Sequence, residues 1–240
     1  MPLLEVDDVR AGYGSSPVLD GVSLSVEEGE TDALLGRRGA GKSTVLLCLA
    51  GFLKPWGGSI RFDGREVRAD DTRTLVGLGV ALVPEGRHGF PDLSVDQNLT
   101  VAAWSTRRGR AGWVQNRDVV FELFPGLAVL SDHPASRLPS SQQQLLAVAR
   151  AIMTSPRLLL VDEASSGLDP AQSQELFRLT RRINAEGITV LMAEQSARLL
   201  RHADRAIVLE SGRVLSVGPA SELAEGDELP GASLGAPPAG

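Results

Sequence analysis

The sequence predicts an α/β fold with a mostly parallel core sheet, an antiparallel β-region near the N-terminus and a helical region at about residues 90–150. Three observations support this prediction. An apolar run, Ala33–Leu35, leads into a glycine-rich loop that is followed by a helix-like apolar segment, Val45–Ala50. A second apolar run, Leu158–Val161, has the continuous character of a buried parallel strand. Residues 3–26 instead alternate apolar and polar side chains, as antiparallel strands do.

The chain has the composition of an ordinary globular protein. Its 240 residues are 42% hydrophobic and 22% charged, and they suffice for one large or two small domains. A net charge of -6 argues against a general affinity for the nucleic-acid backbone, so we expect no nucleic-acid partner. The single cysteine, Cys48, excludes an internal disulfide and is expected to be a buried, inert thiol. Because no secretion signal and no run of roughly 18 apolar residues is present, we expect a cytosolic setting.

The first two predicted strands are joined by a glycine-containing loop, Gly12–Pro17. This loop carries the only tyrosine, Tyr13, which could stack on a purine base or serve only in packing. A further alternating strand is expected at Ser59–Phe62, closed by a turn at Asp63–Gly64.

Residues 36–44 match the phosphate-loop pattern G-x-x-x-x-G-K-[ST] at every fixed position. The glycines of this loop are expected to adopt positive φ and to let backbone N–H groups approach an anion. Lys42 would reach the β- and γ-phosphates of a nucleotide, and the Ser43 hydroxyl would bind Mg²⁺. The alternative is a glycine-rich turn between strand and helix that binds no ligand. The predicted nucleotide-binding residues are Gly36, Arg37, Arg38, Gly39, Ala40, Gly41, Lys42, Ser43 and Thr44.

Acidic side chains follow two of the apolar strands. Leu158–Val161 is followed by Asp162 and Glu163, and Gly79–Pro84 is followed by Glu85. In open α/β sheets, groups that contact the ligand lie at the carboxyl ends of the strands. We therefore expect Asp162 to support the metal and Glu163 to act as general base for an attacking water. Taken alone, the stretch 158–163 could equally be a strand followed by a solvated acidic turn.

Capping residues predict where several helices begin. Ser94 and Asn116 are each expected to cap a helix, the second of which covers residues 117–124. A third helix is expected to start at Asp169–Pro170 and to end before Gly187.

The last part of the chain contains strands and then a tail. The apolar run Ile188–Ala193 predicts a buried strand that ends in Glu194–Gln195. Ser211–Gly212 separates two further strands and predicts a hairpin. Residues 225–240 are rich in Gly, Pro, Ala and acidic residues, which is typical of a flexible C-terminal tail.

Together, these motifs resemble the nucleotide-binding subunit of ATP-binding-cassette (ABC) transporters over residues 3 to about 224. The stretch Val83–Leu99, with Ala193–Gln195 and Ala203–Ala206, more narrowly resembles one of the two ATPase subunits of branched-chain (hydrophobic) amino-acid importers. The resemblance implies a P-loop NTPase cassette at residues 1–224, in which the region at about 90–150 is a helical subdomain.

The resemblance assigns roles to the predicted site residues. It implies that Tyr13 stacks on adenine and that Glu85 replaces the glutamine that senses Mg²⁺ and the membrane partner. Gln195 stands at the switch position where many relatives carry His, and Ser166–Asp169 would cross a dimer interface. The implied catalytic residues are Lys42, Glu163 and Gln195, and the implied metal-binding residues are Ser43, Glu85 and Asp162.

The resemblance also implies a function: hydrolysis of ATP, with Mg²⁺, to power an importer of branched-chain or other hydrophobic amino acids. Two such ATPase subunits, identical or different, would sandwich ATP head to tail. The chain would bind membrane permease subunits at the cytoplasmic face of the cell membrane and serve a substrate-binding protein indirectly. Two alternatives remain open, namely a non-hydrolysing or weakly hydrolysing regulatory subunit and the ATPase of an exporter. A translation-associated ATPase would normally need two cassettes in one chain.

The sequence departs from the family at the signature Leu-Ser-Gly-Gly-Gln, which serves ATP on the opposite subunit. Pro139 removes a hydroxyl and a backbone donor, while Ser140 and Ser141 add side chains where glycine permits close approach. Losing a charge-assisted hydrogen bond costs about 1.5–3 kcal/mol, so a weakened half-site and slow turnover by the chain alone are expected. The predicted signature residues are Leu138, Pro139, Ser140, Ser141 and Gln142.

Two further departures lie in or before the phosphate loop. Arg38 replaces the usual Asn, and Asp32 stands where an apolar strand residue is expected. A buried carboxylate is costly unless it is paired, so we expect Asp32 either to pair with Arg37 or Arg38 or to lie at an exposed strand start.

Overall fold

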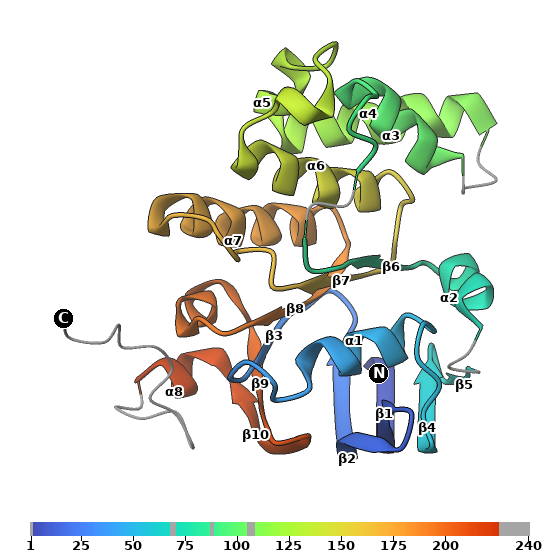
Figure 1. The fold of residues 1–240 in the computed structure, drawn as a ribbon, viewed down its shortest axis with the longest axis vertical. Coiled ribbons are helices and arrows are strands. Elements are labelled where there is room, and N and C mark those ends of the chain that lie inside the picture. Colours follow the sequence, from blue (N-terminus) through green and yellow to red (C-terminus); the bar gives the residue numbers. More distant parts are fainter. Residues whose placement is uncertain (1, 68–70, 87–88, 105–108, 226–240) are drawn as a thin grey trace.

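The computed structural model describes residues 2–67, 71–86, 89–104 and 109–225 (Figure 1). The predicted tail from residue 226 onward, and residues 87 and 88 of the stretch 83–99, lie outside this part of the chain. The strands form a four-stranded sheet in the order β2-β1-β4-β5 and a six-stranded sheet in the order β10-β9-β3-β8-β7-β6.

The four-stranded sheet is antiparallel and is built mainly from the N-terminal region. It contains β1 (Pro2–Tyr13), β2 (Ser16–Glu27), β4 (Gly57–Phe62) and β5 (Arg65–Glu66). The expected loop at Gly12–Pro17 is wrong, because β1 continues to Tyr13 and β2 already begins at Ser16. Only Gly14 and Ser15 form the turn, since the positive φ of Gly14 allows a tight two-residue connection.

The six-stranded sheet is mostly parallel. Four of its strands are parallel neighbours, with β6 at the edge: β3 (Thr31–Leu35), β8 (Thr189–Glu194), β7 (Leu158–Asp162) and β6 (Val80–Val83). β9 (Arg205–Glu210) pairs parallel to β3, and β10 (Arg213–Pro219) forms the expected antiparallel hairpin with β9. Ser211 and Gly212 both have positive φ at the turn of this hairpin. The carboxyl ends of the central strands therefore meet along one edge of the sheet.

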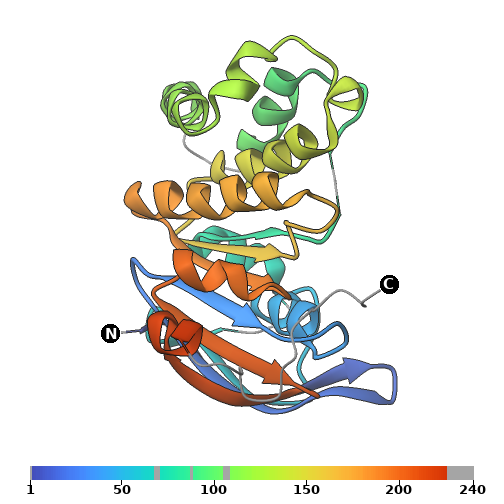
Figure 2. The same cartoon turned by 90° about the vertical axis from the view of Figure 1, so that its left-hand side faces the viewer.

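Helices cover both faces of the parallel sheet. In β3, Ala33 and Leu35 pack into a core with the helices that follow β6, whereas Leu34 packs with α1 (Lys42–Leu49) and the antiparallel sheet. Figures 1 and 2 show α7 on the first of these faces, with the helices α3 to α6 stacked beyond it. The remaining helices are α2 (Thr72–Leu78), α3 (Val95–Ala103), α4 (Gly109–Leu123), α5 (Pro125–Val129), η1 (Ala135–Arg137), α6 (Ser140–Ile152), α7 (Pro170–Ala185), η2 (Ala197–His202) and α8 (Ala220–Glu225).

Two of the three predicted helix caps are confirmed. Ser94 and Asp169 each complete a capping box: the side chain accepts from the backbone N–H three residues on, and the backbone N–H of the capping residue donates to the glutamine side chain at that position. Asn116 is not a cap, since it lies inside α4. Its side-chain amide donates a hydrogen bond to the backbone oxygen of Met153, 2.9 Å away, so a tertiary contact takes the place of the expected capping bond.

Cys48 is a buried free thiol, as expected, and burial raises its pKa to about 12. Among the residues that the structure describes, no helix has the length and apolar character needed to cross a membrane.

Candidate functional site

The phosphate loop joins the end of β3 to the start of α1. Gly39 and Gly41 have φ of 80° and 106°, a backbone conformation that side chains disfavour, and the space beside Gly39 is open. Gly36 does not have the expected positive φ. A Cβ at this position would lie 2.4 Å from the backbone oxygen of Leu209, so Gly36 is needed for close packing against β9.

The start of α1 offers an anion site. The first N–H groups of a helix have no partner within the helix, and its N-terminus carries partial positive charge. Lys42 is the first residue of α1 and its side chain is only 3% exposed. Its Nζ donates to the backbone oxygens of Gly36 at 2.9 Å and Arg37 at 3.2 Å, so the loop wraps around its own lysine.

The three predicted catalytic residues lie together at the carboxyl edge of the sheet. Lys42 Nζ lies 2.9 Å from Glu163 Oε1, and the Gln195 side-chain amide donates to Glu163 Oε2 at 2.7 Å. Both oxygens of the Glu163 carboxylate are thus held, one from the phosphate loop and one from the residue after β8.

The backbone of Glu163 is strained. Its φ of 42° lies in the left-handed region, which costs about 1 kcal/mol or more for a residue with a side chain. Two hydrogen bonds maintain this conformation: Glu163 N donates to Ala193 O at 2.9 Å, and Ser166 N donates to Glu163 O at 3.0 Å. The strain therefore coincides with the turn that aims this carboxylate at the phosphate loop.

Asp162 ends β7 and is buried, and its Oδ1 accepts no hydrogen bond from the residues that the structure describes. Burial raises the pKa of this carboxyl, and the nearby negative charges of Glu163 and Glu85 raise it further, while a Ser43 hydrogen bond and Lys42 act in the opposite sense. A cation would offset these effects. A buried carboxylate oxygen beside a hydroxyl fits Mg²⁺, which is commonly bound by one or two carboxylates together with substrate phosphates. The described residues include no cluster of three or more His, Cys, Asp or Glu that would form a complete protein cage.

The other predicted site residues lie further apart. Tyr13 is 52% exposed next to the β1–β2 turn, and Glu85 is exposed just beyond β6. Pro139 stands at the N-cap position of α6 without a side-chain cap, followed by Ser140 in the first turn. Figure 1 shows α6 in the stack of helices on one face of the parallel sheet and α1 on the other, so one chain does not bring residues 138–142 to its own phosphate loop.

Glu194 makes contacts that the sequence does not predict. Glu194 is buried, and its carboxylate accepts from the Ser165 backbone N–H at 2.9 Å and from the Ser165 hydroxyl at 2.7 Å. Burial raises the pKa of Glu194 to about 6. The sequence signal for Glu194 is a carboxylate at the end of a mostly apolar strand, like Asp162 at the end of β7.

Asp32 has neither of the expected environments. It is fully buried, and Arg205 on the neighbouring strand β9 is its ionic neighbour, at 3.8 Å, in place of Arg37 or Arg38. Neither carboxylate oxygen accepts a hydrogen bond from the described residues. Burial raises the pKa of Asp32 to about 7 despite the opposing charge of Arg205.

Comparison with known proteins relates the chain to a single protein family. Residues 19–166, more than half of the chain, match the family model described as ABC transporter. The chain is 38% identical over 234 residues to the high-affinity branched-chain amino acid transport ATP-binding protein BraG of Pseudomonas aeruginosa, covering 97% of this chain and all of BraG. It is 35% identical over 222 residues to the methionine import ATP-binding protein MetN of Brucella abortus, and spans 60% of that protein. A solved ATP-binding subunit of an ABC transporter superposes with a TM-score of 0.80 and 29% identity, covering 97% of this chain and 96% of that one.

Proposed function

The chain belongs to the ABC transporter family of ATP-hydrolysing proteins, and from that premise we propose that it is the ATPase subunit of an importer for branched-chain or other hydrophobic amino acids. The observation that carries the catalytic part of this proposal is the placement of Glu163 between Lys42 and Gln195. The import and cargo parts rest on the relative BraG, which covers nearly the whole chain. The methionine import ATP-binding protein MetN supports import, with an unbranched hydrophobic amino acid as cargo.

The geometry supports a division of labour in hydrolysis. Lys42 exchanges its contacts with Gly36 O, Arg37 O and Glu163 for the β- and γ-phosphates of ATP, which are stronger anionic acceptors. The freed Glu163 carboxylate then takes the proton of the attacking water, while the Gln195 amide keeps the carboxylate oriented. Bound Mg²⁺ would neutralise phosphate charge, and Ser43 and Asp162 would hold it, with Glu85 nearby.

A second ATPase subunit completes the site in this proposal. Residues 138–142 lie at the start of α6, where Pro139 and Ser140 are exposed and available to another chain. Pro139 offers no backbone N–H, and the serine side chains widen the approach. A partner with an intact signature therefore activates the phosphate loop of this chain, whereas two copies of this chain activate one another poorly. This difference favours a pair of unlike subunits.

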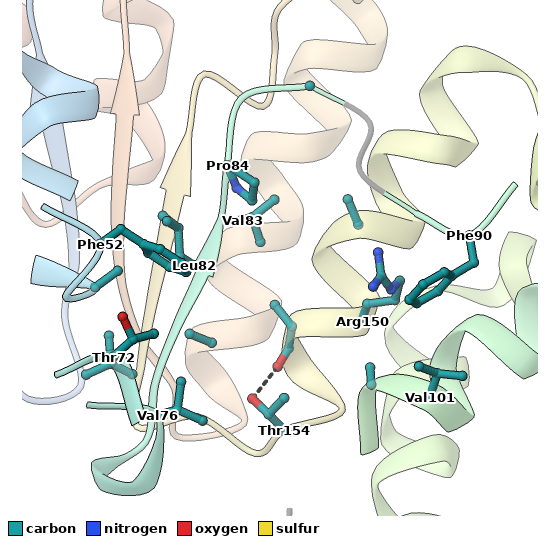
Figure 3. A pocket seen from close by; sticks show the side chains of 17 residues that line it. Phe52, Thr72, Val76, Leu82, Val83, Pro84, Phe90, Val101, Arg150 and Thr154 are labelled. Carbon is teal, nitrogen blue, oxygen red and sulfur yellow. Dashed lines mark hydrogen bonds between the residues drawn. The ribbon is translucent and has the colours of Figure 1, made fainter. Parts of the chain in front are cut away.

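The binding surface for the membrane subunits is proposed to be the groove in Figure 3, with a volume of about 420 Å³. Phe52, Val76 and Phe90 are exposed apolar side chains that line it, and Arg150 of α6 contributes a positive charge near Phe90. Exposed apolar side chains in a groove mark a surface that another protein covers. The groove adjoins Pro84, so its occupant would lie one residue from Glu85 and could sense the metal site.

Two alternatives to this proposal are a non-hydrolysing regulatory subunit and the ATPase of an exporter. A non-hydrolysing regulatory subunit is favoured by Pro139 and the two serines, but it would not need Glu163 in reach of the phosphate loop. An exporter ATPase would have the same cassette, since the cassette does not encode direction.

The test is ATP binding and hydrolysis by the purified chain, alone and together with a second ATPase subunit that carries an intact signature. We expect the chain alone to bind MgATP and the pair to hydrolyse it. Glu163→Gln in this chain should abolish hydrolysis at the ATP site that contains its phosphate loop. If the pair hydrolyses ATP equally well with Glu163→Gln, the proposed catalytic role is wrong. If the pair does not bind the membrane permease subunits of an amino-acid importer, the importer assignment is wrong.

A further inference from the structure

The last two residues of β8 and the residue after it hold the segment that follows β7. Ala193 O accepts from Glu163 N at 2.9 Å, and Gln195 donates to Glu163 Oε2 at 2.7 Å. Between them, Glu194 accepts both hydrogen bonds from Ser165. The tripeptide Ala193–Gln195 thus holds the backbone N–H of Glu163, its carboxylate, and Ser165 two residues later.

Of the two side-chain contacts, the one from Glu194 is buried, whereas Gln195 is exposed. The side chain is 3% exposed, and each of its oxygens has a donor on Ser165. Placing a carboxylate inside a protein is unfavourable unless its hydrogen bonds are made, so an apolar residue would be the simpler choice for packing alone. Charge-assisted bonds to one residue instead give this segment a defined position.

The position matters because Glu163 has a left-handed backbone that relaxes if its neighbours move. Ser165 lies two residues after Glu163, and Ser165 O accepts from Leu168 N at 3.1 Å. Releasing Ser165 therefore frees the turn on both sides: toward the carboxylate, and toward the residues that lead into α7.

We propose that Glu194 is a positioning residue for ATP hydrolysis, which through Ser165 holds Glu163 in the orientation that accepts a proton from water. This inference rests on the proposed role of Glu163 as general base. Glu194 itself does not contact nucleotide, and the phosphate loop is built without it. Its loss therefore lowers kcat and leaves ATP affinity unchanged.

The test compares Glu194→Leu, Glu194→Gln and Ser165→Ala in the complex with the partner ATPase subunit, by kcat and KM for ATP and by equilibrium binding of a fluorescent ATP analogue. We expect Glu194→Leu to lower kcat by about 10- to 100-fold, the loss of one to two charge-assisted hydrogen bonds, with KM and the binding constant changed less than about twofold. Glu194→Gln retains an acceptor for Ser165 and recovers most of the rate. Ser165→Ala removes only the hydroxyl and lowers kcat about threefold to tenfold.

Control variants distinguish a loss of the positioning role of Glu194 from misfolding and from a failure of the proposed function. Glu186→Gln removes an exposed charge just after α7 and is expected to leave kcat unchanged. If Glu194→Leu does not fold, Ser165→Ala, in a half-buried position, still tests the contact. A normal kcat in Glu194→Leu, or a parallel loss of kcat and ATP affinity, overturns the inference. If Glu163→Gln also retains full activity in the same assay, the proposed function fails as well; if Glu163→Gln is inactive, only the role of Glu194 fails.

Discussion

Replacing Asp32 with Asn tests whether an ionised carboxylate is being held in the core sheet. Asp32 is fully buried, neither oxygen accepts a hydrogen bond from the described residues, and Arg205 lies 3.8 Å away. Its pKa of about 7 compares with an ordinary value of 3.8. The folded chain thus binds this proton more tightly than the unfolded chain, so its contribution to stability is present at low pH and is lost as pH rises from about 4 to about 7.

The size of the effect follows from the two pKa values. At about 1.36 kcal/mol per pH unit, keeping this carboxylate in the fold costs about 4 kcal/mol at pH 8 and about 1.5 kcal/mol at pH 5. Asp32→Asn removes this cost, but the buried Asn amide is itself an unpaired polar group and offsets about 1–3 kcal/mol of the stabilisation. Arg205 keeps its contacts with Glu30 and with Ser25 O. We therefore expect Asp32→Asn to raise the free energy of unfolding by about 1–3 kcal/mol at pH 8 and not at pH 4.

The assay is urea denaturation of both proteins at several pH values between 4 and 8. Asp63→Asn is the control of opposite sign, because the Arg157 hydrogen bond holds the pKa of the exposed Asp63 carboxyl below its ordinary value. The stabilising contribution of Asp63 is lost only as pH falls below about 3.8, so between pH 4 and 8 the stability difference between Asp63→Asn and the wild type should stay nearly constant. If the difference in free energy of unfolding between Asp32→Asn and the wild type is the same at every pH, Asp32 is not a buried charge and the prediction is wrong.

Three further predictions concern local structure. Ser94→Ala removes the side-chain bond to Gln97 N at the start of α3 and should lower the free energy of unfolding by about 1 kcal/mol in urea denaturation, whereas Ser94→Asp should not. Gly212→Ala should lower it by about 2 kcal/mol or more in the same measurement, since φ is 77° and the added Cβ would lie 1.9 Å from Val18 O; an unchanged midpoint would contradict the turn geometry. Cys48, buried and with a raised pKa, should react with a thiol reagent only after unfolding, and rapid labelling of the native protein would show that α1 opens.

The parts of the fold that could be predicted from the sequence depend on local patterns. The phosphate loop lies between a buried strand and a helix, and Ser94 and Asp169 cap helices, because each of these features is specified within a few consecutive residues. The β1–β2 turn was expected to be longer, since its glycines and prolines look like loop residues although Gly12 and Pro17 are paired in the sheet.

The parts that could not be predicted depend on contacts between distant residues. Asp32 meets Arg205 because β9 pairs with β3, and no local pattern indicates that pairing. Asn116 donates to the backbone of Met153, so the same side chain that would suit a cap lies inside a helix. The two bonds from Ser165 to Glu194 likewise follow from the pairing of β7 with β8.

The proposed asymmetry of the ATP sites is tested most directly by restoring the signature in this chain. The measurement is the ATP turnover rate of the purified chain alone, as wild type and as the triple variant Pro139→Ser, Ser140→Gly and Ser141→Gly, each also with Glu163→Gln. We expect the restored chain to hydrolyse ATP at least about tenfold faster than the wild type, and Glu163→Gln to abolish both activities. A wild-type chain that hydrolyses ATP as fast as the restored one would show that residues 138–142 already form a working half-site, and would contradict the account.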